Sequence, residues 1–369
     1  MSPSRRTTRR QFLSGESAVE ALGDLTHGEL THRDGGRLPP PGPSKKTGET
    51  YLVQFARTAM ACEFQIFLTA DHSPRAPEAA LSALDLIDQL EDQLTVYRDH
   101  SEICQLNRQA ASYPVEVESQ LFALLKRCLL LYEETEGAFD ITAGPLTRLW
   151  GFYKREGRLP GDEQLQQTLA DIGSRHIQLD DTDTTVRFLQ PGIELNLGGI
   201  GKGYALDRAA ARLQSSGVDH FLLHGGRSSV LARGAKIPAD PQANPWTVGI
   251  GHPRRPDRRL GLLQLRDQAM STSGTATQSF HHHGKRYGHI LDPRTGWPAE
   301  GVLSVSVLSP DAATADALST AFYVLGPEKT EAYCERHPEV AALVMLATGS
   351  AQEVEVVAIN MPNDAWETL

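Results

Sequence analysis

Hydrophobic and polar residues alternate from residue 51 onward in patterns typical of both strands and helices. The segments YLVQFA (51–56) and EFQIFL (63–68) show the alternation and aromatic content of two strands. Between Pro77 and Val96, positions spaced three or four apart predict an amphipathic helix with one core face. A second, more buried helix is predicted over 119–137, where Gly137 is placed to end it.

The remaining pattern predicts short strands interrupted by helices. Strands are expected at 184–190, 193–197, 220–226, 228–234, 246–251, 260–265, 340–349 and 353–359, and helices at the alanine-rich end of 198–213, at 314–326 and just before the last two strands. Strands in hairpin-like succession favour an α+β fold with mixed, largely antiparallel sheets and packed helices over a regular βαβ arrangement.

The first 48 residues differ in composition from the rest of the chain. They are polar and end near GGRLPPPGPSKK, so we expect a flexible N-terminal segment (1–48) followed by one folded domain (49–369). Within the segment, TTRRQFLSG (7–15) resembles the start of a twin-arginine export signal. Acidic residues follow where an apolar region should be, which favours the cytoplasm. Export to the periplasm is the expectation, and a cytoplasmic location is the alternative.

Charge and cysteine content exclude several classes of protein. The formal net charge is -10, which argues against a nucleic-acid-binding surface. No apolar run approaches the roughly 18 residues that a bilayer-spanning helix needs. The four cysteines form no CxxC pair, so core thiols are expected rather than a zinc site or a disulfide framework.

A glycine-rich helix start is the first candidate site. Gly198, Gly199, Gly201 and Gly203 surround Lys202 ahead of an alanine-rich helix. Backbone N–H groups, the helix dipole and a lysine together can bind phosphate. The spacing matches neither a P-loop nor G-x-G-x-x-G. A tight turn packed closely on a sheet explains the glycines equally well, and the spacing leaves both interpretations open.

Asp316 and Thr320 form the second candidate. Their i, i+4 spacing places a carboxylate and a hydroxyl on one helical face, and both are hard oxygen ligands of the kind that Mg²⁺ prefers. An aspartate near a helix start is more often a cap or a dipole partner.

Five other sites carry less specific signals. Tyr97 could stack on a planar ring or be a half-buried boundary residue, and Phe139 and Asp140 follow a helix in a turn. The run 281–283 is three histidines, which fit a solvated hairpin tip better than a metal site because consecutive side chains point in different directions. HILDPRTGWPAEG (289–301) is either a polar turn or the rim of an active site. Ser273 has no nucleophile elbow around it, which argues against a serine hydrolase.

Eight motifs carry a resemblance to a known family. They are TAMACEF (58–64), LTVYRDHSEICQLN (94–107), TEGAFDITAGPLTRLWGF (135–152), LNLGGIGKGYALD (195–207), HGG (224–226), STSG (271–274), HILDPRTGWPAEG (289–301) and TADALSTAFYVLG (314–326). In their order and separations they resemble the ApbE family of FAD:protein FMN transferases, over residues 51–360. The resemblance implies an ApbE-like, T-fold-like architecture and a Mg²⁺-dependent enzyme. Such an enzyme transfers FMN from FAD to a threonine hydroxyl of an acceptor protein and releases AMP.

The resemblance also implies roles for individual residues. Contacts with FAD are implied for Met60, Tyr97, Ala138, Phe139, Asp140, Asn196, Lys202 and Ile290; metal ligation for the Gly199 carbonyl, Asp316 and Thr320; and a part in transfer for His289. A histidine that titrates near neutrality could serve as base for a threonine hydroxyl. The same site could instead hydrolyse FAD to FMN and AMP, or bind flavin without catalysis.

The chain departs from the family pattern at four places. Ala61 and Cys62 stand where Gly-Thr is usual, and Asn196 stands in place of an aspartate. Arg227 replaces an Asp or Asn, and residues 275–276 are Thr-Ala rather than Asp-Tyr. These departures put catalytic efficiency and acceptor preference in doubt more than the nucleotide class.

Overall fold

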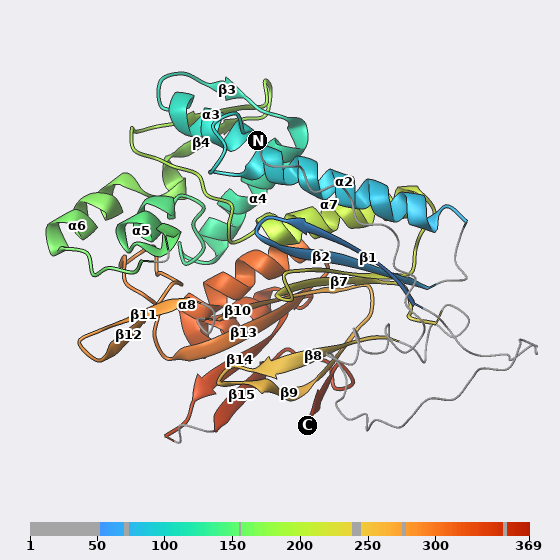
Figure 1. The fold of residues 1–369 in the computed structure, drawn as a ribbon. Coiled ribbons are helices and arrows are strands. Elements are labelled where there is room, and N and C mark those ends of the chain that lie inside the picture. Colours follow the sequence, from blue (N-terminus) through green and yellow to red (C-terminus); the bar gives the residue numbers. More distant parts are fainter. Residues whose placement is uncertain (1–51, 70–73, 155, 238–244, 275–277, 350–352) are drawn as a thin grey trace, which may run out of the picture.

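The computed structural model describes residues 52–69, 74–154, 156–237, 245–274, 278–349 and 353–369 (Figure 1). The segment 1–48, its twin-arginine-like motif and the departure at 275–276 lie outside the described residues.

An eight-stranded antiparallel sheet forms the centre of the molecule, in the order β1-β2-β6-β7-β10-β13-β14-β15. Its strands are β1 (Leu52–Ala59), β2 (Cys62–Thr69), β6 (Phe221–Gly225), β7 (Ser229–Arg233), β10 (Ala269–Gly274), β13 (Val302–Ser309), β14 (Ala341–Ala347) and β15 (Val354–Ile359). The prediction of an α+β fold with largely antiparallel sheets and packed helices is confirmed.

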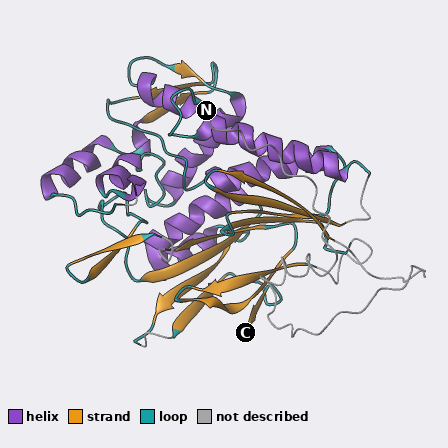
Figure 2. Cartoon of the chain, viewed as in Figure 1, coloured by secondary structure: helices purple, strands orange, loops and turns teal. Residues whose placement is uncertain are grey.

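Different layers cover the two faces of this sheet (Figures 1 and 2). On one face lie α2 (Ala76–Leu94), α7 (Gly201–Ser215) and α8 (Ala312–Arg336), which enclose the larger core with Phe64, Ile66 and Leu223. On the other lies a three-stranded sheet in the order β16-β9-β8, whose core includes Phe67 and Leu222. Successive residues of β2 and β6 therefore face opposite layers, as strand geometry requires.

The smaller elements surround one end of the helical layer. They are α3 (Glu102–Gln109), β3 (Val115–Glu116), α4 (Ser119–Glu134), α5 (Gly144–Leu149), α6 (Asp162–Asp171), β4 (Ile177–Asp180), β5 (Thr185–Phe188), β11 (Ser279–His282) and β12 (Lys285–Gly288). The three-stranded sheet on the opposite face consists of β8 (Trp246–His252), β9 (Arg255–Leu265) and β16 (Trp366–Thr368). As predicted, α4 ends before Gly137, which has φ 77°, and the three histidines lie exposed at the tip of the β11–β12 hairpin.

The strand predicted at 193–197 is wrong. Ile193, Leu195 and Leu197 are buried in alternation, but no strand of the described part of the chain pairs with them. The side chain of Asn107 instead brackets Leu195, with Oδ1 accepting its N–H at 2.7 Å and Nδ2 donating to its carbonyl at 3.1 Å. A single amide side chain thus satisfies backbone groups that a ladder would otherwise satisfy.

The start of α8 is held by a carboxylate from α7. Asp207 accepts the backbone N–H groups of Ala312 and Ala313, each at 2.8 Å. The first N–H groups of a helix have no intrahelical partner, so these two bonds cap α8 and fix it against α7. The predicted helix over 314–326 is confirmed as the first part of α8, which is interrupted at Gly326 (φ 76°) and resumes at Pro327.

We expect Asp207→Ala to lower the free energy of unfolding by about 1–3 kcal/mol, because it leaves two buried N–H groups without acceptors. Chemical denaturation of the variant and the parent protein measures this difference. Gln214→Ala, an exposed change on the same helix, is the control and should have little effect. A loss below about 0.5 kcal/mol for Asp207→Ala would show that the cap contributes little.

Candidate active site

One cavity of about 960 Å³ lies where the helical layer meets the smaller elements. Segments distant in sequence form its walls. Of the residues predicted from the sequence, those that line it are Tyr97, Ala138, Phe139, Asp140, Asn196, Gly199, Lys202, His289, Ile290, Asp316 and Thr320. The fold therefore gathers the predicted nucleotide, metal and transfer positions around a single space.

Met60 does not line this cavity, but its neighbours Ala61 and Cys62 do. Met60 and Ala61 are the two turn residues between paired Ala59 and Cys62, with φ of 49° and 58°. Two-residue hairpin turns of this kind favour glycine or asparagine. The alanine at position 61 therefore adopts a conformation that the usual glycine would adopt without steric cost.

Gly199, which precedes α7, and Gly203, in the first turn of α7, have different structural roles. A Cβ on Gly203 would lie 2.0 Å from the Ala312 carbonyl oxygen, so this glycine permits α7 and α8 to meet at their N-terminal ends. A Cβ on Gly199 would lie 3.5 Å from Phe139 and 3.8 Å from Thr320 Oγ1, at the cavity wall. Close packing therefore explains Gly203. Gly199 lies at the cavity wall, where binding of phosphate stays a prediction.

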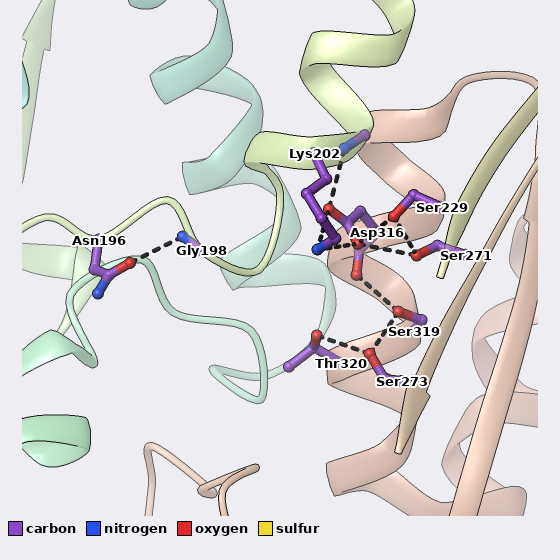
Figure 3. A network of polar contacts seen from close by, with 10 residues as sticks. Asn196, Gly198, Lys202, Ser229, Ser271, Ser273, Asp316, Ser319 and Thr320 are labelled. Atoms are coloured by element: carbon purple, nitrogen blue, oxygen red, sulfur yellow. Dashed lines mark hydrogen bonds and ion pairs between the residues drawn. The ribbon is translucent and has the colours of Figure 1, made fainter. Parts of the chain in front are cut away.

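Asp316 is the centre of a buried polar network (Figure 3). The residue is 4% exposed, and its Oδ2 accepts the N–H of Gly203 at 3.1 Å in the first turn of α7. Lys202 Nζ lies 3.5 Å from both carboxylate oxygens. Ser229 and Ser271 donate their hydroxyls to Oδ1 at 3.2 and 2.9 Å. The lysine, the helix N-terminus and the hydroxyls together stabilise a charge that would otherwise be costly to bury.

Thr320 extends this network along the same face of α8. Ser273 Oγ lies 3.2 Å from Thr320 Oγ1 and 2.8 Å from Ser319 Oγ (Figure 3). Asp316, Thr320 and the adjoining Gly199 supply the oxygen chemistry that suits Mg²⁺. Within the described ranges, no three His, Cys, Asp or Glu side chains form a metal-binding group. A single carboxylate fits Mg²⁺ when a phosphate-bearing substrate supplies further oxygens.

Asn196 links the glycine turn to an aromatic wall. Its Oδ1 accepts the N–H of Gly198 at 2.9 Å, and its Nδ2 donates to Tyr153 Oη at 3.4 Å. The first bond needs only an acceptor oxygen, so asparagine can replace aspartate in holding this turn. The second bond needs an N–H donor, which an ionised aspartate lacks.

Two tyrosines stand at this wall, and the sequence indicated only one of them. Tyr97 is 73% exposed, and its ring centre lies 5.2 Å from that of Tyr153. Burial raises the pKa of Tyr153 to about 12, so its hydroxyl keeps its proton. Tyr153 lies in the 3-10 turn Phe152–Lys154, where neither spacing nor a motif signals a binding role. Its aromatic character alone could have indicated it.

Asp140 lines the cavity, but its carboxylate is hydrogen-bonded to residues of the surrounding protein. Oδ1 accepts the N–H and the hydroxyl of Thr142 at 2.8 and 2.7 Å and the hydroxyl of Ser174 at 2.7 Å. These bonds fix the turn that brings Ala138 and Phe139 to the cavity. Asp140 is thus placed to hold this segment in position.

His289 enters the cavity at the end of the β11–β12 hairpin. Its Nδ1 lies 3.0 Å from the carbonyl oxygen of Gln278. A carbonyl can only accept, so Nδ1 carries the proton of the neutral ring and Nε2 is the nitrogen that can accept one. Burial lowers the pKa of His289, an effect that the Gln278 carbonyl opposes and that Arg286 adds to. The imidazole is therefore neutral at neutral pH.

The rest of HILDPRTGWPAEG forms a braced loop. Asp292 accepts from the backbone N–H and the guanidinium of Arg294, and Leu291 pairs with Pro298. Trp150 Nε1 donates to the Gly296 carbonyl at 2.8 Å from within an aromatic cluster. Asp292 is thus an anchor of the turn, and the loop is the rim of the cavity.

Comparisons with known proteins agree with this geometry. The model of the ApbE family matches residues 60–344. A protein of Treponema pallidum named FAD:protein FMN transferase is 36% identical over 269 residues, which are 70% of this chain and 74% of the relative. A protein of the same name from Vibrio cholerae is 33% identical and covers 71% of this chain and 78% of its own length. The crystal structure of the ApbE protein from Thermotoga maritima has a TM-score of 0.73 and 30% identity, covering 83% of this chain and 96% of that one.

Proposed function

Because the chain belongs to the ApbE family, we propose that its cavity binds FAD and transfers the FMN part to a protein, with Mg²⁺ bound and AMP released. Transfer of flavin from FAD to a protein is the activity that the names of its curated relatives state. The finer proposal is that the acceptor atom is a threonine hydroxyl.

A single observation carries this proposal. The buried Asp316 and the half-buried Thr320 and Lys202, at the first turn of α7, line the same cavity as His289. Phosphoryl transfer spreads negative charge over oxygens and requires cationic and N–H groups fixed in advance. It also requires the acceptor hydroxyl to lose a proton. The cavity contains groups suited to both tasks.

The oxygen ligands for Mg²⁺ would be the Asp316 carboxylate, the Thr320 hydroxyl and the Gly199 carbonyl. When bound, the ion supplies charge stabilisation for the diphosphate oxygens. Lys202, at 3.5 Å from Asp316, balances the carboxylate and adds a second positive charge near the α7 N-terminus.

The acceptor hydroxyl would be activated by His289. The threonine Oγ forms a bond to the phosphorus of the FMN part, while the bond from that phosphorus to the bridging oxygen breaks and AMP leaves with that oxygen. The threonine proton passes to His289 Nε2, because Nδ1 is held by Gln278. Tyr97, Tyr153 and Phe139 offer aromatic faces for the planar rings of FAD.

Purified protein incubated with FAD, Mg²⁺ and a threonine-containing acceptor peptide tests this proposal. We expect a fluorescent peptide with the mass of an added FMN phosphoester, together with one AMP per peptide. Removing Mg²⁺ with EDTA should abolish the product, and a peptide with valine in place of threonine is the matched control. Free FMN and AMP without labelled peptide would show hydrolysis, and intact bound FAD would show a flavin-binding protein. Failure to bind FAD would overturn the proposal.

A further inference from the structure

We propose that Arg227, in the turn between β6 and β7, binds the diphosphate of FAD in addition to Lys202. This inference rests on the proposed function, because it takes FAD to be the occupant of the cavity. Arg227 is one of the positions at which the chain departs from the family pattern, and the proposal gives it the FAD diphosphate as its ligand.

The turn places Arg227 beside the network of Asp316. Gly225 and Ser229 are paired, so residues 226–228 form the tip of the β6–β7 hairpin, and all three line the cavity. Ser229 follows directly and donates its hydroxyl to Asp316 at 3.2 Å. Arg227 is thus two residues from Ser229, which donates to the Asp316 carboxylate, and Lys202 contacts the same carboxylate. The phosphate-binding groups proposed above lie in this part of the cavity.

The turn is packed against another hairpin. A Cβ built on Gly226 would lie 3.0 Å from Cys62 Cβ and 3.1 Å from its Sγ, so the β6–β7 tip lies against the β1–β2 tip. Arg227 itself has φ 62°, a region uncommon for residues with a side chain. The chain thus holds an arginine at a position where glycine or asparagine would adopt the backbone conformation more easily.

Among the described residues, no carboxylate of the cavity lining forms an ion pair with Arg227. The cavity is lined by two carboxylates, Asp140 and Asp316, and both are engaged: Asp140 by Thr142 and Ser174, and Asp316 by the network around Lys202. In the part of the chain that the structure describes, Arg227 is exposed and pairs with no acidic side chain. A guanidinium keeps its charge at every physiological pH, and its planar fork matches phosphate oxygens.

Two departures from the family pattern act in the same direction. Asn196 removes a negative charge from the cavity and Arg227 adds a positive one. Both changes favour a more anionic occupant. The diphosphate is the anionic group of FAD, whereas the isoalloxazine and adenine rings are neutral, so the diphosphate is the group that this added charge would bind.

Replacing Arg227 with glycine tests the proposal without straining the turn, since glycine adopts φ 62° readily. We expect Arg227→Gly to raise the KM for FAD about tenfold, the loss of one charge-assisted contact to phosphate. The effect on kcat should be smaller, and Arg227→Lys should recover part of the loss. The KM difference should shrink at high salt, because the guanidinium is exposed.

Riboflavin, which lacks phosphate, separates this role from a general effect on the cavity. Its dissociation constant, measured by fluorescence quenching, should be the same for the parent protein and for Arg227→Gly. Arg258→Ala, an exposed arginine outside the cavity lining, is the matched control and should leave the KM for FAD unchanged. Melting temperatures of all variants establish that they are folded.

Three results would overturn the proposal: an unchanged KM for FAD, an equal loss of riboflavin binding, or a rise confined to the KM for the acceptor peptide. The last would assign Arg227 to the acceptor protein instead of the donor. If the parent protein neither binds FAD nor labels a peptide, the proposed function itself fails. If the parent protein transfers FMN and the Arg227→Gly variant has the same KM for FAD, the proposal on Arg227 fails and the proposed function stands.

Discussion

Replacing Asp316 with asparagine is expected to lower kcat/KM for FMN transfer by about 100-fold or more while the protein still folds. Asparagine has nearly the same shape, and its single oxygen can take the place of Oδ1 and accept the hydroxyls of Ser229 and Ser271. Its amide nitrogen then takes the place of Oδ2 and cannot accept the N–H of Gly203. The variant loses the negative charge that would bind Mg²⁺ and that balances Lys202. The Mg²⁺ concentration for half-maximal rate should therefore rise together with the loss of rate.

The control for this change is Glu328→Gln, which removes one negative charge from the same helix at an exposed position outside the cavity. Its transfer rate and Mg²⁺ dependence should match the parent protein. Circular dichroism and melting temperature show whether Asp316→Asn is folded. A folded Asp316→Asn variant with at least half of the parent rate and an unchanged Mg²⁺ dependence would rule out Asp316 as the metal ligand.

The fold could be predicted from the sequence wherever strand and helix periods are clear. The alternation in β1 and β2 and the spacing in α2 give the ends of those elements to within about three residues. The central strands β10 and β13 were absent from the expected set. The sequence of β13, VLSVSVLS, does alternate, and it places Val305 and Val307 in the larger core. In β10, AMSTSG, the positions on the same face are Ser271 and Ser273, which contact Asp316, Ser319 and Thr320. A strand whose core-facing positions form a polar site does not show the hydrophobic alternation that identifies strands.

The strand expected at 193–197 fails for a related reason. Its alternating burial has the period of a strand, but the partner of Leu195 is the side chain of Asn107, 88 residues earlier. Periodicity reports which side chains are buried and does not report where the backbone hydrogen bonds go. That assignment depends on which segment the fold brings alongside.

Most residues of the site could be predicted from the sequence only through its resemblance to a family. Physical reasoning on spacing alone joined Asp316 to Thr320 and placed the glycines at a helix start. It could not place His289 near them, because His289 reaches the cavity from the end of the β11–β12 hairpin, where the Gln278 carbonyl holds its ring. Nor could it identify Tyr153, which reaches the cavity through its hydrogen bond with Asn196.

The split between Asp140 and Asp316 shows why residue type is not enough. Both are acidic, both line the cavity, and both follow from family motifs. Asp140 bonds within its own turn and to Ser174, whereas Asp316 joins a lysine, a helix N-terminus and two strands. The partners of each carboxylate, which only the fold defines, separate an anchor from a candidate ligand.

Replacing His289 with alanine is expected to lower kcat by about 100-fold or more, with little change in the affinity for FAD. The imidazole would remove the acceptor's proton but contribute little to nucleotide binding, so the loss should fall on kcat. His176→Ala, which removes an imidazole outside the cavity lining, is the control and should retain full activity. FAD affinity is followed by flavin fluorescence and kcat by peptide labelling.

The pH dependence gives an independent measure of the same role. Burial lowers the pKa of His289 below the ordinary value of 6.5, so the neutral, proton-accepting form persists to lower pH than in a free histidine. The parent rate should fall as the pH is lowered, with its midpoint below pH 6.5, at the lowered pKa. His289→Ala should lose this step along with most of its rate. A parent rate that instead rises through pH 7 to 8, or a His289→Ala variant with at least half of the parent kcat, would exclude His289 as the base. The proton of the acceptor hydroxyl would then have to leave by another route.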